Sequence, residues 1–140
     1  PNIELVSVLL LVYTSVIGKK VFYPLYTFVL VEGLIYGFGI WWINYLYVWA
    51  VLVAIVLLLK KQESPVVWMV VAGLFGLSFG ALTTLPYFFI GGIEMAWAYF
   101  LNGIPFDLLH CAGNCVTALV LYKPLVRLMK RCIERWPVAV

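Results

Sequence analysis

Residues 104–136 read IPFDLLHCAGNCVTALVLYKPLVRLMKRCIERW, an apolar stretch of membrane length with polar residues near its start and cations near its end. Within it, Asp107, His110 and Asn114 are three and four residues apart, which places them within about 60° of one another on a helix. Ionisable side chains in a membrane helix cost about 2.5–3.5 kcal/mol each on insertion scales and usually face a bundle interior or a cavity. We therefore expect these residues to form a polar stripe inside a helical bundle.

The composition of the whole chain supports the same fold class. Of its 140 residues, 66% are hydrophobic and 11% are charged, whereas an ordinary soluble domain is about 25% charged. Because a transmembrane helix needs about 20 residues, four or five spans use nearly the whole chain. We expect an all-α membrane protein, a helical bundle of five transmembrane helices in a single domain, residues 1–140.

Glycine, proline and lysine residues separate the expected spans. Residues 93–103 are too short and too polar, at Glu94 and Asn102, to span, and we expect them to form an amphipathic cap at the membrane surface. The expected spans are residues 2–18, 21–39, 40–59, 65–91 and 104–131.

The nine basic residues all fall on one side of this predicted bundle: Lys19, Lys20, Lys60, Lys61, Lys123, Arg127, Lys130, Arg131 and Arg135. By the positive-inside rule this side is cytoplasmic, so we expect a multi-pass plasma-membrane protein with residue 1 outside and the C-terminus inside. An odd number of spans that starts outside indicates one preceding helix that this chain lacks. The spread of the cations along a membrane face argues against nucleic acid as a partner.

Polar and aromatic side chains gather in the outer half of the predicted bundle. A cavity lined by aromatic rings and a few hydrogen-bonding groups is typical of a small-molecule site. We expect a substrate site formed by Asp107, His110, Asn114, Trp41, Trp42, Asn44, Tyr45, Tyr87, Glu4 and Glu32, and Asn2 lies at the outer end of the first span.

Six of these residues also have a structural interpretation. Asp107 suits the start of a helix, where the helix dipole favours a carboxylate. His110 and Asn114 suit hydrogen bonds between helices, and Glu32 suits an internal polar tie. The two tryptophans at 41–42 are also typical anchors at a membrane interface.

Small residues recur at intervals that allow close helix packing. Gly76 and Gly80 form a Gly-x-x-x-Gly pattern that Gly73 extends, and Gly33 and Gly37 form another. Two interpretations are open: packing within the chain, or a docking face at Gly73, Gly76 and Gly80 for a partner subunit.

The sequence patterns for a disulfide, a metal site or a catalytic nucleophile are weaker. Cys111 and Cys115 lie one helical turn apart, which does not suit a disulfide, and with one histidine they make a poor metal site. The Gly-x-Ser-x-Gly match at residues 76–80 lies within an apolar span, without the strand and sharp turn that a nucleophile needs. No Walker loop or His-Glu-x-x-His motif occurs, so we expect no catalytic residue, metal or cofactor.

Two stretches resemble the substrate-binding (S) components of energy-coupling factor (ECF) vitamin transporters. These are PNIELVSVLLLVYTSVIGKK at residues 1–20 and GIPFDLLHCAGNCVTALVLYKPLVRLMKR at residues 103–131. The second contains a Phe-Asp-x-x-His-Ala-x-Gly-Asn-type motif, in which Cys111 stands where the family usually has alanine.

The resemblance implies a six-helix protein, its first helix missing here, that captures a vitamin or vitamin precursor, such as a cobalamin-related compound, from the outer face. It also implies association with a transmembrane coupling subunit and two cytoplasmic ATPases, so the chain itself is not expected to be an enzyme. By motif match, Asp107, His110 and Asn114 line or shape the ligand pocket and Glu4 lies near its rim. The Met-His start of the metal-specific members does not occur, which argues against nickel or cobalt as cargo.

Two other functions remain open: a membrane assembly protein whose polar stripe only joins helices, and a membrane enzyme that uses Asp107 and His110 as acid and base. A transporter predicts an outward-opening void between the third, fourth and fifth spans that touches Asp107 and Asn114. It also predicts that Asn114→Ala abolishes ligand capture without unfolding the protein, whereas an assembly role predicts destabilisation.

Overall fold

The computed structural model describes residues 4–135, and within that range the chain is helical and contains no strand. Asn2 lies outside the described residues. The elements in order are α1 (Val6–Ile17), the short 3-10 helix η1 (Gly18–Val21), α2 (Phe22–Tyr36), α3 (Ile40–Leu58), α4 (Pro65–Thr83) and α5 (Leu85–Arg135).

Four helical segments of the described chain are long and apolar enough to cross a membrane: Val6–Tyr36, Ile40–Leu58, Pro65–Thr83 and Leu85–Arg135. The expectation of an all-helical chain with helices of membrane length is confirmed, but the count of five spans is not. The first two expected spans fall in the one segment Val6–Tyr36, where α1 has 12 residues and α2 has 15. At 1.5 Å per residue these helices are only about 18 and 22 Å long, shorter than a hydrocarbon core of about 30 Å.

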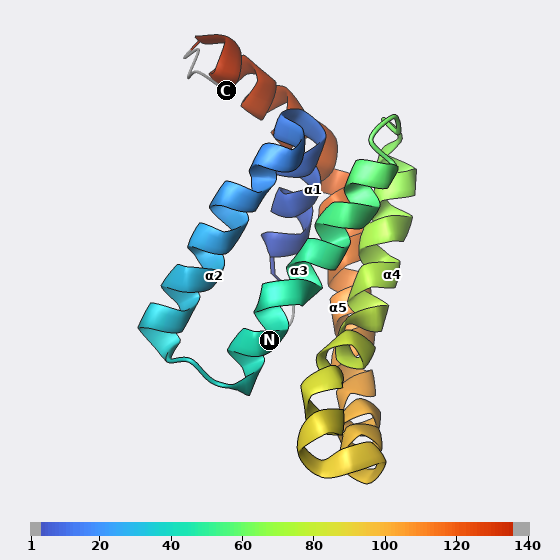
Figure 1. The fold of residues 1–140 in the computed structure, drawn as a ribbon. Helices are drawn as coiled ribbons and strands as arrows, with labels where there is room; N and C mark the ends of the chain where they lie inside the picture. The colour runs from blue at the N-terminus through green and yellow to red at the C-terminus, as the bar shows by residue number, and fades with distance from the viewer. Residues whose placement is uncertain (1–3, 136–140) are drawn as a thin grey trace.

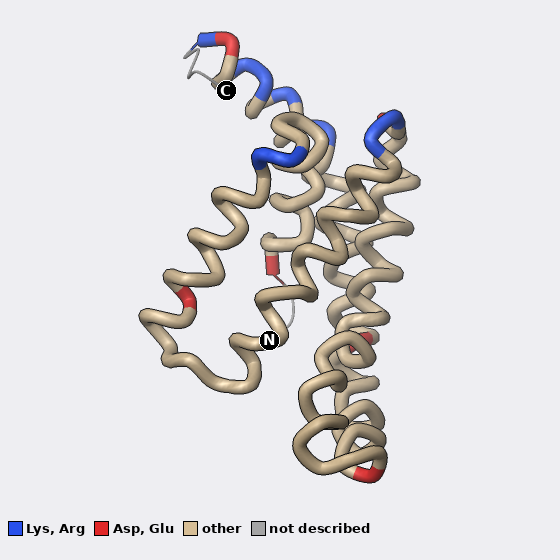
Figure 2. The backbone as a smooth tube through the Cα atoms, in the orientation of Figure 1, with Lys and Arg blue, Asp and Glu red and all other residues tan. Residues whose placement is uncertain are grey.

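The helices pack around α1 and α5. Helix α4 runs along α5, α1 packs against both α5 and α3, and α2 contacts α3 (Figure 1). Lys and Arg residues lie only at one end of the bundle, which we call the basic end, at the α1–α2 turn, the α3–α4 turn and the end of α5 (Figure 2). The predicted segregation of positive charge is therefore present in three dimensions.

A kink divides α5 near its start. Gly91 and Gly92 leave helical geometry, and Gly92 has φ 69°, a left-handed conformation that glycine adopts without a steric penalty. Residues 65–91, expected as one span, are divided where α4 ends at Thr83, and residues 93–103, expected as a surface cap, are helical and continuous with 104–131. The chain folds back at this kink, at the end of the bundle away from the cations (Figures 1 and 2).

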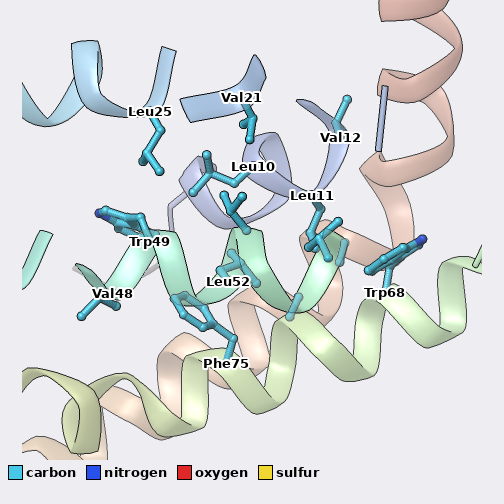
Figure 3. Close-up of a cluster of buried hydrophobic side chains, with 14 of the residues drawn as sticks. Leu10, Leu11, Val12, Val21, Leu25, Val48, Trp49, Leu52, Trp68 and Phe75 are labelled. Carbon is cyan, nitrogen blue, oxygen red and sulfur yellow. The ribbon is translucent and has the colours of Figure 1, made fainter. Parts of the chain in front are cut away.

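The apolar core lies where α1, α3 and α4 meet (Figure 3). Leu11, Leu52 and Trp68 are fully buried there, and the Trp49 ring lies against Phe75 with ring centroids 5.9 Å apart. Because lipid tails are as apolar as these side chains, close packing rather than exclusion of water holds such a core together in a membrane. The core fixes α1 beside α3 and α4, and thereby sets the position of the polar face of α5.

Candidate functional site

The polar stripe of α5 faces the inside of the bundle. Asp107, His110 and Asn114 are 5%, 3% and 1% exposed, and the same face continues through the buried Ala118 and Tyr122. These residues recur every three or four positions, so they form one line along the helix. The buried face of α5 carries polar residues at the end away from the cations, and a small and an aromatic residue, Ala118 and Tyr122, farther along.

Asp107 binds the neighbouring helix α4. Its Oδ1 accepts a hydrogen bond from the Gly80 backbone N–H at 2.9 Å. A Cβ atom at Gly80 would collide with the Asp107 carboxylate. The missing side chain at Gly80 is therefore what allows the carboxylate to reach the backbone of α4.

His110 lies against the N-terminus of α1. Its Nε2 is 3.2 Å from Oε1 of Glu4, at hydrogen-bond distance. Glu4 also caps α1, because its carboxylate accepts bonds from the Val6 N–H, the Ser7 N–H (3.2 Å) and the Ser7 hydroxyl (2.8 Å). Burial raises the pKa of Glu4, but the hydrogen bonds with His110 and Ser7 outweigh burial and leave its pKa below the ordinary value.

Asn114 joins three helices. Its Nδ2 donates to the Ser7 hydroxyl of α1 and to the Ala72 carbonyl of α4, both at 3.2 Å. Farther along, the Tyr122 hydroxyl donates to the Ser15 hydroxyl at 3.0 Å. Glu4–His110, Ser7–Asn114 and Ser15–Tyr122 thus form three successive polar contacts, which align α1 and α5 in the same direction along the bundle.

The glycine face of α4 packs onto α5. A Cβ at Gly76 would lie 2.8 Å from the carbonyl carbon of His110, and one at Gly73 would collide with the Cys115 sulfur. Backbone atoms cannot move aside as a flexible side chain can, so Gly76 permits the closest approach of the two helices. Gly73, Gly76 and Gly80 therefore serve packing within the chain, and a partner could dock on them only if α4 and α5 separated.

The candidate residues on α2 and α3 form a separate aromatic group. The Trp42 indole donates to the Val29 carbonyl of α2 at 2.9 Å, and the buried Asn44 accepts a hydrogen bond from the Tyr47 hydroxyl at 2.7 Å. Tyr45 lies edge-on between Trp41 and Trp49, with centroid distances of 5.3 and 5.5 Å. Glu32 is half-buried on α2. Trp42 therefore ties α3 to α2, Asn44 and Tyr45 contact other residues of α3, and none of these side chains lines the cavity beside Asp107 described next.

A cavity of about 370 Å³ lies beside Asp107, between α4 and the residues of α5 that follow the kink. We call it the Asp107 cavity. It differs from the expected void between the third, fourth and fifth spans, because it touches Asp107 but neither α3, His110 nor Asn114 contributes to its wall. Its lining residues are Phe79, Gly80, Thr83, Tyr99, Asn102, Gly103, Phe106 and Asp107.

Thr83, Tyr99 and Asn102 were not among the expected site residues. The spacing did contain a signal: Tyr99, Gly103 and Asp107 are four residues apart, so they share one face of a continuous helix. Tyr87, which was expected in the site, stacks on Tyr99 with ring centroids 3.9 Å apart and thereby supports the wall from outside. Residues 93–103, expected as a separate cap, carry this face because they form one helix with residues 104–135.

The side chains that line the cavity can form hydrogen bonds and aromatic contacts with a bound molecule. It combines one carboxylate, one amide and hydroxyl groups with aromatic walls, and its volume lies at the lower end of the range of about 300–1,000 Å³ for ligand pockets. Across residues 4–135, no three His, Cys, Asp or Glu side chains are placed to hold a metal ion.

Comparison of the chain with protein-family models, curated proteins and solved structures gives no match.

Proposed function

We propose that this chain is the solute-capture subunit of an ECF-type importer, and that it binds a vitamin or vitamin precursor at the Asp107 cavity. The observation that carries the proposal is a buried carboxylate in the wall of an aromatic-lined cavity, at the end of the bundle away from the cations. A buried ionisable group in a membrane-length helix is costly and typically marks a substrate site.

The distribution of charge supports capture from outside. All Lys and Arg residues lie at the basic end, and by the positive-inside rule that end faces the cytoplasm. The Asp107 cavity then lies in the outer half of the bundle. Energy for release inward would come from a transmembrane coupling subunit and two cytoplasmic ATPases, as the resemblance at residues 1–20 and 103–131 implies.

The groups that line the cavity indicate the size and the functional groups of the solute. Among the described residues, only the Gly80 N–H donates to Asp107, and it uses Oδ1, so Oδ2 is available to a donor on the solute. Phe79, Tyr99 and Phe106 offer faces for stacking. We expect a one- or two-ring compound with an N–H or O–H donor, a size closer to a benzimidazole-like fragment than to a whole corrinoid.

Native mass spectrometry of the purified chain tests the proposal directly, by detecting a co-purified small molecule. Asp107→Asn keeps the size of the side chain but removes its charge, and Asn102→Ala removes an exposed lining group. Both should reduce the small-molecule adduct at least tenfold. Ser78→Ala is the control, since Ser78 lies on α4 outside the cavity and bonds only to Leu74 of its own helix. An adduct that is absent from the wild-type protein, or equal in all variants, would contradict the proposal.

A second candidate, a membrane assembly protein, is favoured by one specific observation. The hydrogen bonds of His110 and Asn114 go to α1 and α4 and not to the cavity. In this case Asp107→Asn would change stability alone, and no small molecule would be released from the protein. The enzyme alternative has less support, because His110 does not line the cavity that Asp107 lines.

A further inference from the structure

A second polar cavity lies at the basic end, far from the Asp107 cavity. Its volume is about 340 Å³, and it is formed by α1, the turn between α3 and α4, and the later part of α5. We call it the basic cavity. Its lining residues are Ser15, Lys60, Gln62, Glu63, Tyr122, Lys123, Val126, Arg127 and Lys130.

The charge around the basic cavity is unbalanced. Four of its lining residues are cations and one, Glu63, is an acid. Within residues 4–135, no Lys or Arg lies within salt-bridge distance of a carboxylate, since the sole pair found is His110 with Glu4. Lys123, Arg127 and Lys130 share one face of α5, and Lys60 reaches the same space from a different element. Four cations therefore converge on one place, where Glu63 is the one acid of the lining and makes no salt bridge with any of them.

Buried neighbours hold this cavity in shape. The Trp68 indole donates to the Gln62 carbonyl at 3.3 Å, which fixes the α3–α4 turn. The Trp68 ring also packs on Tyr122, with centroids 5.6 Å apart, and the Tyr122 hydroxyl bonds to Ser15. Trp68 and Tyr122 are buried, and the hydrogen-bonded hydroxyls of Tyr122 and Ser15 line the cavity.

We propose that the basic cavity binds the phosphate-bearing headgroup of an anionic phospholipid from the leaflet at the basic end. Lys and Arg side chains are the usual phosphate ligands in proteins, and basic pockets between membrane helices bind anionic headgroups. The cavity lies at the ends of membrane-length helices, where such headgroups are concentrated. The positive-inside rule alone does not explain why four cations line one cavity. Lys19, Lys20 and Lys61 place positive charge at the same end of the bundle and lie outside the cavity.

The test is native mass spectrometry of the full chain, delipidated in detergent and titrated with phosphatidylglycerol or phosphatidylcholine. One variant carries Lys60→Gln and Arg127→Gln, which remove two exposed cations from the cavity. The control carries Lys19→Gln and Lys20→Gln, which remove the same charge from the same end but outside the cavity. Taking about fivefold in affinity for each cation that contacts the headgroup, we expect phosphatidylglycerol binding to fall roughly 25-fold in the first variant. It should change less than about fivefold in the control, whose cations lie outside the cavity.

Two further arms complete the experiment. Glu63→Gln removes the acid that lines the cavity and should strengthen phosphatidylglycerol binding. Inorganic phosphate, added in place of lipid, separates a lipid site from a site for free phosphate. Equal losses in the two double variants, equal binding of phosphatidylcholine, or equally tight and equally variant-sensitive binding of inorganic phosphate would each overturn the proposal. All the replaced side chains are exposed, so the variants should fold, and gel filtration with tryptophan fluorescence verifies this.

Discussion

Replacement of Asn114 by alanine should destabilise the bundle, because the Asn114 amide joins α5 to both α1 and α4. The variant loses the hydrogen bonds from Nδ2 to the Ser7 hydroxyl and to the Ala72 carbonyl. Hydrogen bonds between membrane helices contribute about 0.6 kcal/mol each on average and at most about 1.7 kcal/mol. The two bonds together are therefore worth roughly 1–3 kcal/mol.

Two smaller effects modify this value. Removal of a buried side chain leaves a small cavity, which adds to the loss. In the opposite direction, Asn114 Oδ1 is buried and has no hydrogen-bond partner among the described residues, so its removal relieves a cost. We expect a net destabilisation of about 1–2 kcal/mol, which is a factor of roughly 5–30 in the unfolding equilibrium.

The assay is reversible unfolding in mixed micelles, followed by tryptophan fluorescence, on a double-mutant cycle. Ser7→Ala, Asn114→Ala and the double variant should give a coupling energy of about 0.6 kcal/mol, with an upper bound near 1.7 kcal/mol. Thr117→Ala paired with Ser7→Ala is the matched control. The Thr117 hydroxyl donates to Gly113 of its own helix, so this pair should show no coupling.

Zero coupling between Ser7 and Asn114 would refute the contact between α1 and α5 at this depth. If Asn114→Ala left the stability unchanged but abolished solute capture, the structural role of Asn114 would be refuted altogether. That outcome would place Asn114 in contact with the solute, as the resemblance to S components first indicated.

Two more predictions use the same unfolding assay. Gly76→Ala should cost about 1–3 kcal/mol, because its Cβ would lie 2.8 Å from the His110 carbonyl carbon, whereas Gly103→Ala has no atom nearer than 3.9 Å and should gain up to about 1 kcal/mol of helix propensity. If Gly76→Ala were tolerated as well as Gly103→Ala, the close packing of α4 on α5 would be wrong. Glu4 has a folded-state pKa below its ordinary value of 4.5, so the stability it contributes is present above that value and is lost as the pH falls through the lowered pKa. Below about pH 4.5 the wild-type protein should therefore lose stability relative to Glu4→Gln, and parallel pH curves for the two proteins would contradict the Glu4–His110 contact.

Spacing alone predicted which face of α5 lies inside the bundle. Asp107, His110 and Asn114 are buried because three- and four-residue intervals repeat along one side of a helix. The identity of their partners was not predictable in this way. Glu4 and His110 are 106 positions apart, and helical periodicity carries no information about which helices lie next to one another.

The Asp107 cavity was predicted only in part. A carboxylate in a membrane helix indicated a site, but the wall comes from Thr83, Tyr99 and Asn102. These residues meet Asp107 because the kink at Gly91 and Gly92 turns the chain back along α4, and a pair of glycines in a sequence marks a break without giving its direction.

The end of the bundle that carries the Asp107 cavity should face the outside of the cell, and the basic end should face the cytoplasm. A membrane-impermeant maleimide tests this in intact cells that express the full chain. Asn102→Cys combined with Cys132→Ser presents an exposed thiol beside the cavity, and the unmodified chain presents the exposed Cys132 at the basic end. We predict that the thiol at position 102 is labelled in intact cells and that Cys132 is labelled only after permeabilisation. Labelling of Cys132 from outside, with protection of position 102 until the cells are opened, would contradict capture from the outer face.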